Sequence, residues 1–384
     1  MTDWQTESVV GWLLRDGRMI GDLTRLTEAL GERLLEAGAP LSRLRVSMRI
    51  LHPLFTATSA VWQSGGRPTT DAVAVHGLEQ RSGYLGSPLA QVGRTGRPFR
   101  RRLERGLDDS DHSVLHALAA EGATDYLALP MPLASGHSAT MVAATDRAGG
   151  FEDPDLAKLE EIASLLCLLV EALAAHRLAR TIVDAYIGPR SGRRVLDGQI
   201  RRGDVETLRA AIWFSDLRGW SRLANSLPAA EAVALANGYF ELVESAVNEA
   251  GGEILKLIGD AVLAVFPADG EGGGEQAACR NAVEAALAAQ RRAVETESPL
   301  RFGVGLHLGE LIYGNVGTPT RLDFTVMGQA VNLAARLEGL TKTLERPVVV
   351  SEALAQTVDV ACCDLGLHPI PGWDEPVRGF APES

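Results

Sequence analysis

The chain has 384 residues, of which 46% are hydrophobic and 22% charged, and its formal net charge is -12. This length allows two domains of ordinary size, and the composition supports a buried core and excludes wholesale disorder. An acidic surface repels nucleic acid and anionic membranes, so neither is an expected partner.

The cysteines and the N-terminus favour a cytoplasmic protein. The four cysteines are Cys167, Cys279, Cys362 and Cys363. They show no CxxC pair and no zinc-ligand spacing, so we expect reduced thiols. The start, Met1 to Gln5, lacks the basic and apolar regions of a secretion signal. The most apolar run, Ile162 to Val170, is too short to span a bilayer.

Residues 8 to 50 are predicted to form two helices, the second in the apolar stretch that runs from Pro40 through Leu51. Short strands are expected at 59–62, 124–130 and 139–144. The first helix rests on leucines at helical spacing, which are Leu23, Leu26, Leu30 and Leu34.

A further helix is predicted to begin at Asp153-Pro154, with Asp as the N-cap and Pro at the first helical position. Its apolar residues follow the 3, 4, 3, 4 spacing of a coiled-coil seam, and they are Leu159, Ile162, Leu166, Leu169 and Leu173. The seam is equally compatible with an amphipathic helix that covers its own domain. It ends at His176, and the Arg- and Gly-rich residues that follow are expected to be a connector.

Residues 1–175 resemble a GAF-type sensor domain. The resemblance rests on the strand Tyr126 to Leu129, the turn Gly149-Gly150-Phe151 and the closing helix. It implies an α/β sensor that receives an unknown small-molecule or protein input, because fold analogy alone does not identify a ligand.

The first chemical motif is an apolar strand from Ile212 that ends in Asp216. A turn containing Gly219 and Trp220 then leads into helical sequence. A carboxylate at a strand end is a metal-ligand position, and backbone N–H groups at a helix start bind phosphate. The alternative is an aspartate in an ordinary surface turn.

The second motif is a predicted hairpin with Asp260 at its tip, after Ile258-Gly259. It could place Asp260 beside Asp216, and close carboxylates repel unless cations such as two divalent metal ions lie between them. Lys256 interrupts an otherwise apolar strand, so its ammonium must meet a partner or face a cleft. The alternatives are a plain Gly-Asp turn and a lysine that snorkels from a strand edge.

Residues 301–317 are predicted to form a Gly-rich hairpin that serves as scaffold, with His307 in the sheet. In the fourth motif a strand runs to Met327, and a helix follows in which Asn332 and Arg336 lie on one face. All other residues from 330 to 337 are apolar, so we expect this polar stripe to be buried against a cleft that holds phosphate. The alternative is a stripe that faces solvent.

These four motifs, in this order, resemble the catalytic domain of class III adenylate and guanylate cyclases over about residues 205–384. The resemblance implies an α+β fold with a ferredoxin-like βαββαβ core. It predicts the domain plan 1–175 for the sensor, 176–204 for a helical connector and 205–384 for catalysis.

The resemblance also implies roles for single residues. Asp216, Asp260 and the Leu217 carbonyl would bind two Mg²⁺ or Mn²⁺ ions, and Gly219 and Trp220 would contact the substrate. The other nucleotide contacts would be Lys256 at adenine N1, Thr325 at the adenine amino group, Asn332 at the ribose and Arg336 at the α-phosphate.

The pair Lys256 and Thr325 resembles adenylate cyclases, and it predicts conversion of ATP to cyclic AMP. Guanine N1–H would face the lysine as a second donor, a mismatch that costs roughly 1–3 kcal/mol. The resemblance further implies a homodimer with two equivalent shared sites. A guanylate cyclase and a catalytically silent nucleotide- or partner-binding module remain alternatives.

The chain departs from the family at one place. Many members carry a late lysine that grips the triphosphate, but no lysine follows Lys342 here. Arg378 or another arginine is the expected substitute.

Overall fold

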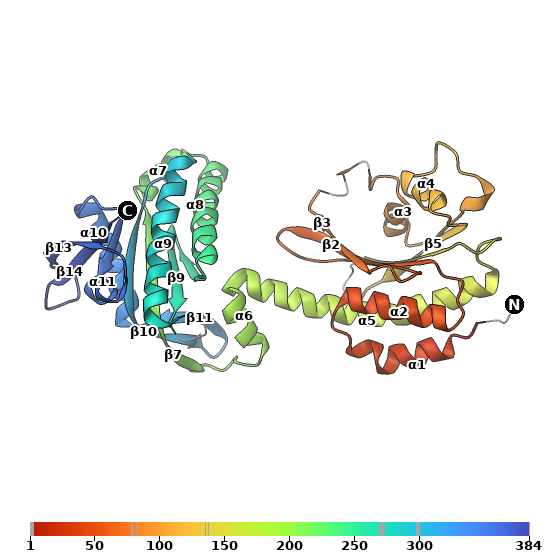
Figure 1. Cartoon of the computed structure of the whole chain (residues 1–384), viewed down its shortest axis with the longest axis horizontal. Helices are drawn as coiled ribbons and strands as arrows, with labels where there is room; N and C mark the ends of the chain where they lie inside the picture. Colours follow the sequence, from red (N-terminus) through yellow and green to blue (C-terminus); the bar gives the residue numbers. More distant parts are fainter. Residues whose placement is uncertain are drawn as a thin grey trace. The chain divides into compact units, whose positions relative to one another are not determined.

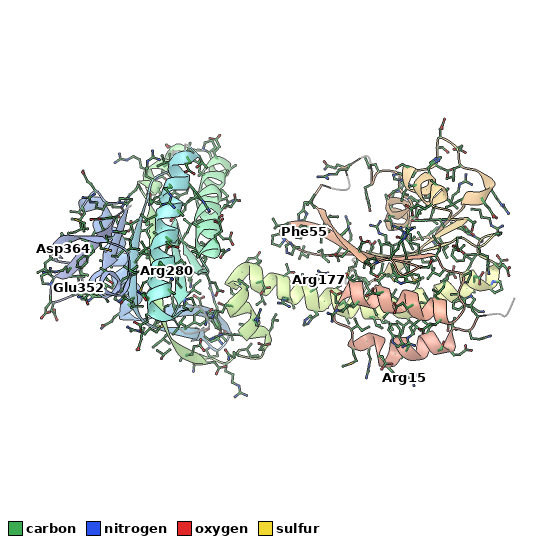
Figure 2. The ribbon with its side chains drawn as sticks, in the orientation of Figure 1. Arg15, Phe55, Arg177, Arg280, Glu352 and Asp364 are labelled. Carbon is green, nitrogen blue, oxygen red and sulfur yellow. The ribbon has the colours of Figure 1, made fainter. Side chains whose placement is uncertain are left out.

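The computed structural model describes residues 4–77, 80, 81, 83–134, 136, 138–268, 273–296 and 300–383. It divides the chain into two compact units, Met1–Ile182 and Val183–Ser384. Arg15 and Phe55 belong to the first unit, and Arg280 belongs to the second (Figure 2). The start of the chain considered above for a secretion signal lies largely outside the described residues.

The first unit is a six-stranded antiparallel sheet in the order β3-β2-β1-β6-β5-β4. Helices α1, α2 and α5 lie on one face, and α3 and α4 lie on the other (Figure 1). The elements are α1 (Glu7–Arg15), α2 (Leu23–Glu36), β1 (Arg43–Arg49), β2 (Phe55–Gln63), β3 (Thr70–Val75), α3 (Pro88–Thr95), β4 (Phe99–Arg102), α4 (Ser113–Ala120), β5 (Asp125–Pro132), β6 (Ser138–Thr145) and α5 (Asp153–Ile187).

The second helix predicted up to Leu51 is wrong, because this stretch forms strand β1. Leu44, Val46 and Met48 are at most 2% exposed and point to the core. Polar residues alternate with them, which is the period of a strand whose two faces differ. The polar side chains of β1 therefore point away from the main core of the unit.

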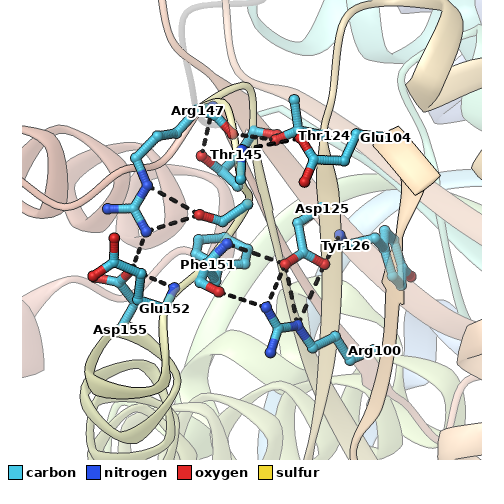
Figure 3. Close-up of polar contacts among 12 residues, drawn as sticks. Arg100, Glu104, Thr124, Asp125, Tyr126, Thr145, Arg147, Phe151, Glu152 and Asp155 are labelled. Carbon is cyan, nitrogen blue, oxygen red and sulfur yellow. Dashed lines mark hydrogen bonds and ion pairs between the residues drawn. The ribbon is translucent and has the colours of Figure 1, made fainter.

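A buried ion pair ties strand β5 to the turn before α5 (Figure 3). Asp125 is fully buried and accepts hydrogen bonds from Arg100 at 2.7 Å and from the N–H groups of Tyr126 and Phe151 at 3.0 Å. Gly150 adopts φ +70°, and a Cβ there would lie 2.6 Å from a carboxylate oxygen of Asp125. The turn therefore requires glycine and leaves the carboxylate of Asp125 well satisfied.

Helix α5 covers its own unit with the residues of the predicted seam. Leu159, Ile162 and Leu166 are at most 1% exposed, and Leu169 and Leu173 pack against the same core. The amphipathic alternative therefore describes this half of the helix, not a coiled-coil seam. With 35 residues α5 is long and apolar enough to cross a bilayer by length and composition alone. The core contacts account for one face of the helix, whereas Leu168 and Ile182 are exposed.

The second unit is an eight-stranded sheet in which β10-β7-β9-β8 form a continuous antiparallel run that ends at the edge strand β8. With α8 and α9 inserted, this is the predicted βαββαβ core of a ferredoxin-like fold. The elements are α6 (Pro189–Leu196), β7 (Val205–Leu217), α7 (Trp220–Ser226), α8 (Ala229–Glu249), β8 (Glu253–Ile258), β9 (Ala261–Pro267), α9 (Gly274–Glu295), β10 (Phe302–Thr318), β11 (Arg321–Met327), α10 (Gln329–Thr343), β12 (Val348–Ser351), α11 (Glu352–Thr357), β13 (Cys362–His368) and β14 (Val377–Pro382).

The two faces of this sheet carry separate cores. Helices α8, α9 and α11 pack on the face that includes Trp213 and Val304. Helix α10 packs on the opposite face, against Ile212 and Leu311. Figure 1 shows α8 and α9 side by side.

The hairpin predicted within residues 301–317 is wrong, because β10 is one continuous strand of 17 residues. Its glycines serve packing rather than turning. A Cβ at Gly305 would lie 2.2 Å from the carbonyl oxygen of Ala334, and one at Gly309 would lie 2.7 Å from Cβ of Ala330. This glycine stripe, Gly305 and Gly309, lets helix α10 lie directly on the strand.

Candidate active site

The hairpin β8–β9 brings two carboxylates together at the end of β7. Asp216 pairs in register with Ala261 of β9, and Ile258 pairs with Ala261 from the other side. The tip between them holds Gly259, with φ +64°, and Asp260. The carboxyl groups of Asp216 and Asp260 are close enough to share a hydrogen bond.

The electrostatics of the pair favour a bound cation. Burial, the hydrogen bond with Asp260 and the negative charge of Asp260 all raise the pKa of Asp216. Lys342 opposes them, with Nζ 3.8 Å from a carboxylate oxygen of Asp216. Two touching carboxylates ionise together only when positive charge lies beside them. The pair therefore fits divalent metal ions, whose preferred ligands are oxygens.

The surroundings limit what else could hold a metal ion. Within the described ranges, no group of three or more His, Cys, Asp or Glu side chains gathers to hold a metal ion. Leu217 is the last residue of β7 and directly follows Asp216, so its carbonyl is a neighbouring backbone oxygen that could also bind a cation. Gly219, with φ +67°, precedes Trp220, the first residue of α7, which is half-buried. Remaining metal ligands must come from backbone, water or a bound substrate.

One face of helix α10 contacts the carboxylate side of the unit. Arg218 donates a hydrogen bond to the buried Glu338 at 3.2 Å and also to Thr341. Burial raises the pKa of Glu338, and the Arg218 charge opposes this. Lys342 lies one residue beyond Thr341 and reaches Asp216. The sequence analysis gave Arg218 and Glu338 no role, because only the packing of α10 on β7 and β10 brings them together.

Asn332 and Arg336 lie on another face of α10 and are exposed to solvent. The prediction that they are buried against a cleft is therefore wrong for a single chain. The helix instead buries Ala334 and Leu337. At 1.5 Å of rise per residue, Asn332 lies roughly 15 Å along the helix axis from Lys342. The structure thus does not bring Asn332 to the carboxylate pair of its own chain.

Lys256 meets a partner that the sequence analysis missed. It lies within β8 and forms an ion pair with Asp323 of β11. Thr325, two residues further along β11, shares the face of Asp323 and is half-buried. The expectation that the ammonium of Lys256 must find a partner is confirmed. The i, i+2 spacing places Asp323 on the same strand face as Thr325, which is the signal that could have identified it.

Two other expectations can be placed. Arg378 forms an exposed ion pair with Asp364 at 2.9 Å, in the hairpin β13–β14. His307 lies within β10 as predicted, with Nδ1 2.8 Å from the hydroxyl of Ser351. Burial, aided by the charge of Arg209, lowers the pKa of His307 to about 4, so the ring is neutral near pH 7.

Residues 205–366 match the model of the adenylate and guanylate cyclase catalytic domain. This part of the chain is a class III cyclase domain. It contains the carboxylate pair, the Lys256–Asp323 pair and helix α10, so these groups belong to the cyclase domain. The resemblance to this family inferred from the four motifs is confirmed, whereas the GAF-like assignment of residues 1–175 stays a prediction.

Curated relatives include two named adenylate cyclases. One, from Anabaena cylindrica, is 32% identical over 167 residues, which cover 41% of this chain and 32% of the relative. Another, adenylate cyclase 1 of Rhizobium meliloti, is 28% identical over 272 residues, or 67% of this chain and 41% of the relative. The chain thus spans about a third to two fifths of the length of these relatives.

Similar solved structures include both adenylyl and guanylyl cyclases. The adenylyl cyclase CyaB from P. aeruginosa is 26% identical with a TM-score of 0.41, covering 47% of this chain and 96% of its own. The guanylyl cyclase Cya2 is 26% identical with a TM-score of 0.38, covering 46% and 92%.

Proposed function

We propose that this chain is an adenylate cyclase that converts ATP to 3′,5′-cyclic AMP and pyrophosphate at sites shared by two copies of its cyclase domain. The observation that carries the proposal is that two different faces of helix α10 hold two different sets of polar residues. One face, with Lys342, reaches the carboxylate pair of its own chain. The other face presents Asn332 and Arg336 to solvent, where a second copy would meet them.

Asp216 and Asp260 are the residues that would hold two Mg²⁺ or Mn²⁺ ions, with the Leu217 carbonyl as a further ligand. When bound, such ions lower the pKa of the ribose 3′-OH and offset charge on the pyrophosphate leaving group. The protein keeps the two carboxylates adjacent at the cost of a raised pKa for Asp216. The charge of Lys342 already opposes this rise, and bound cations would oppose it further.

The partner copy would supply the residues that orient the nucleotide. Arg336 carries a guanidinium that can bind two phosphate oxygens at once, and it would stabilise charge that develops on the α-phosphate during attack by the 3′-OH. Asn332, one turn earlier, would hold the ribose. Gly219 and Trp220 start α7 next to the carboxylates, where backbone N–H groups can receive phosphate oxygens.

Base selection is assigned to Lys256 and Thr325. Asp323 holds the Lys256 ammonium beside β11, so the lysine can donate to adenine N1 while Thr325 accepts from the amino group. Guanine presents a donor at N1 and a carbonyl at C6, which reverses both contacts. We expect the purified full-length chain with Mn²⁺ to form cyclic AMP from ATP at least ten times faster than cyclic GMP from GTP. Equal rates would contradict the base assignment, and no product from either nucleotide would favour a silent binding module.

The shared site is tested by complementation between inactive variants. Asp216→Asn and Arg336→Ala should each lower kcat by at least about a hundredfold. Mixed and allowed to exchange subunits, they should recover about a quarter of wild-type activity, because half of the dimers are hybrids with one intact site of two.

The matched control mixes Asp216→Asn with Asp260→Asn. Both substitutions fall in the same half of the site, so no hybrid contains an intact site and activity should not return. Recovery in this control, or none in the first mixture of folded dimers, would contradict the shared site.

We further propose that the first unit regulates the cyclase domain through α5, which begins in that unit and continues to Ile187. Removal of residues 1–182 should change either kcat or the dimer dissociation constant, measured by cyclic AMP formation and by sedimentation. An unchanged rate together with unchanged dimerisation would remove the regulatory role.

A further inference from the structure

The face of the first sheet that carries α3 and α4 is closed by an apolar cluster over one half and borders a cavity over the other. Over β4, β5 and β6 the helices close an apolar cluster, formed by Val92, Leu103, Leu115, Leu118, Tyr126, Ala128 and Val142. Over β1, β2 and β3 the same face borders a cavity of about 480 Å³. This volume suits a small molecule, because typical ligand pockets measure about 300–1,000 Å³.

A cation and a row of hydroxyl groups form the polar wall of this cavity. Arg45 of β1 donates hydrogen bonds to the hydroxyls of Ser47 at 3.0 Å and Ser59 at 3.2 Å. Ser47 lies opposite Ser59 on β2 and opposite Thr140 on β6. Ser59 and Thr140 are 5% and 7% exposed, so these hydroxyls are almost fully withdrawn from bulk water. A serine hydroxyl that accepts from Arg45 still has its own proton to donate.

The charge of Arg45 is not compensated in the described part of the chain. No described carboxylate forms an ion pair with Arg45, which donates its side-chain hydrogen bonds to the two serines. Arg100, also on this sheet, instead pairs with the buried Asp125. Burial lowers the pKa of Arg45; Tyr126 opposes this shift, and the neighbouring charge of Arg43 adds to it. A half-buried cation among neutral donors and another cation is stabilised by an anion.

We propose that this cavity binds a small organic anion, a carboxylate or a phosphate monoester joined to an apolar body. The anionic head would accept hydrogen bonds from Arg45 and from the Ser47 and Ser59 hydroxyls. The apolar body would pack on the apolar residues of the lining, among them Ala57, Ala72, Ala74 and Leu89. Arg94 at the exposed rim adds positive charge along the route of entry. The site lies entirely within the first unit and needs no catalytic activity of the second.

The test uses four aromatic probes on the full-length chain by isothermal titration calorimetry. Benzoate and phenyl phosphate present the two anionic heads, and benzamide and benzyl alcohol are neutral controls of similar size. We expect at least one anion to bind tenfold or more tightly than both neutral probes, and the better of the two anions identifies the head group. Equal binding of all four, or binding of none, overturns the proposal.

Variants assign the effect to the cavity. Arg45→Gln should remove the preference for the anion, whereas Arg67→Gln, which removes an exposed charge from the same unit outside the cavity, should keep it. An unchanged preference in Arg45→Gln overturns the proposal.

Folding of the variant is checked without any probe. Because Arg45→Gln removes an uncompensated cation, its thermal midpoint should equal or exceed that of the wild type. If it does not fold, Ser47→Ala takes its place and should weaken the anion several-fold while leaving benzamide binding within twofold. An equal effect of Ser47→Ala on both probes overturns the assignment of the head group.

Discussion

Asp125 begins the buried strand β5 of the first unit, and Asp216 lies near the end of the buried strand β7 of the second. The neighbours of these two carboxylates differ in charge. Asp125 accepts from Arg100 and from two backbone N–H groups. Asp216 faces Asp260, and the cation nearest to it, Lys342, stands 3.8 Å away. The first arrangement is complete within the chain, whereas the second becomes complete only with added positive charge.

The same contrast separates two arginines of the first sheet. Arg100 has a carboxylate partner and connects strand to helix, whereas Arg45 has serine hydroxyls and an open cavity. Charges that are satisfied internally thus stabilise the fold, and charges that are left partly unsatisfied beside a cavity or a hairpin tip mark places for ligands. Three substitutions measure how far this contrast holds.

The largest effect on stability is expected for Asp125→Ala. This change leaves Arg100 without its partner and two N–H groups unsatisfied in a buried site, which costs about 3–5 kcal/mol. The free energy of unfolding of the first unit, from urea denaturation followed by tryptophan fluorescence, checks it. The control Asp111→Ala removes another arginine-paired aspartate in this unit and should cost much less. A loss below 1 kcal/mol for Asp125→Ala would show that this ion pair is not structural.

Asp216→Asn should act in the opposite direction on stability. Without divalent cations the variant should be more stable by about 1 kcal/mol, since repulsion between two unit charges at contact is relieved in a partly solvated site. The raised pKa of Asp216 means that the folded state holds a proton that the unfolded chain releases near pH 4. The contribution of Asp216 to stability should therefore fall as pH rises above about 4, so the difference in stability between the variant and the wild type should grow over this range.

Manganese titration sharpens this second prediction. Mn²⁺ should raise the thermal midpoint of the wild type and leave that of Asp216→Asn unchanged, because one carboxylate alone binds the ion weakly. Equal shifts in both proteins would place the metal elsewhere.

The smallest effect is expected for Arg280→Gln on α9, labelled in Figure 2. Its ion pair with Asp359 measures 3.2 Å, and both side chains are more than 40% exposed. Such a surface pair contributes about 0.5 kcal/mol or less. Unfolding of the second unit in guanidinium should hardly change, and a loss above 1 kcal/mol would break the distinction between buried and exposed pairs.

Much of the cyclase domain could be predicted because its signals are local. An apolar strand that ends in Asp216 and a Gly-Asp turn between two apolar strands define their own geometry, and together they predict the carboxylate pair. The helix after Gly328 also follows directly from its sequence. Each of these features depends on residues that are neighbours in the chain.

The errors occurred where the deciding contact is distant in sequence. Gly305 and Gly309 suggested a turn, but their role is to admit Ala334 and Ala330 of α10. The stretch before Leu51 is predicted to be a helix, although its alternation of polar and apolar residues fits a strand. The structure shows a strand, which pairs with β2 on one side and β6 on the other. Glycine and short apolar runs do not reveal which segment will pack against them.

The glycine stripe of β10 also has a mechanical consequence. Because α10 rests on bare backbone at Gly305 and Gly309, a single added methyl group at either position would push the whole helix outward as one body. Lys342 would then retreat from Asp216 in its own chain while Asn332 and Arg336 shifted toward any neighbouring copy. Under the proposed sharing of sites between two copies, one small displacement of α10 would alter the Asp216 site of its own chain and also the site to which Asn332 and Arg336 contribute.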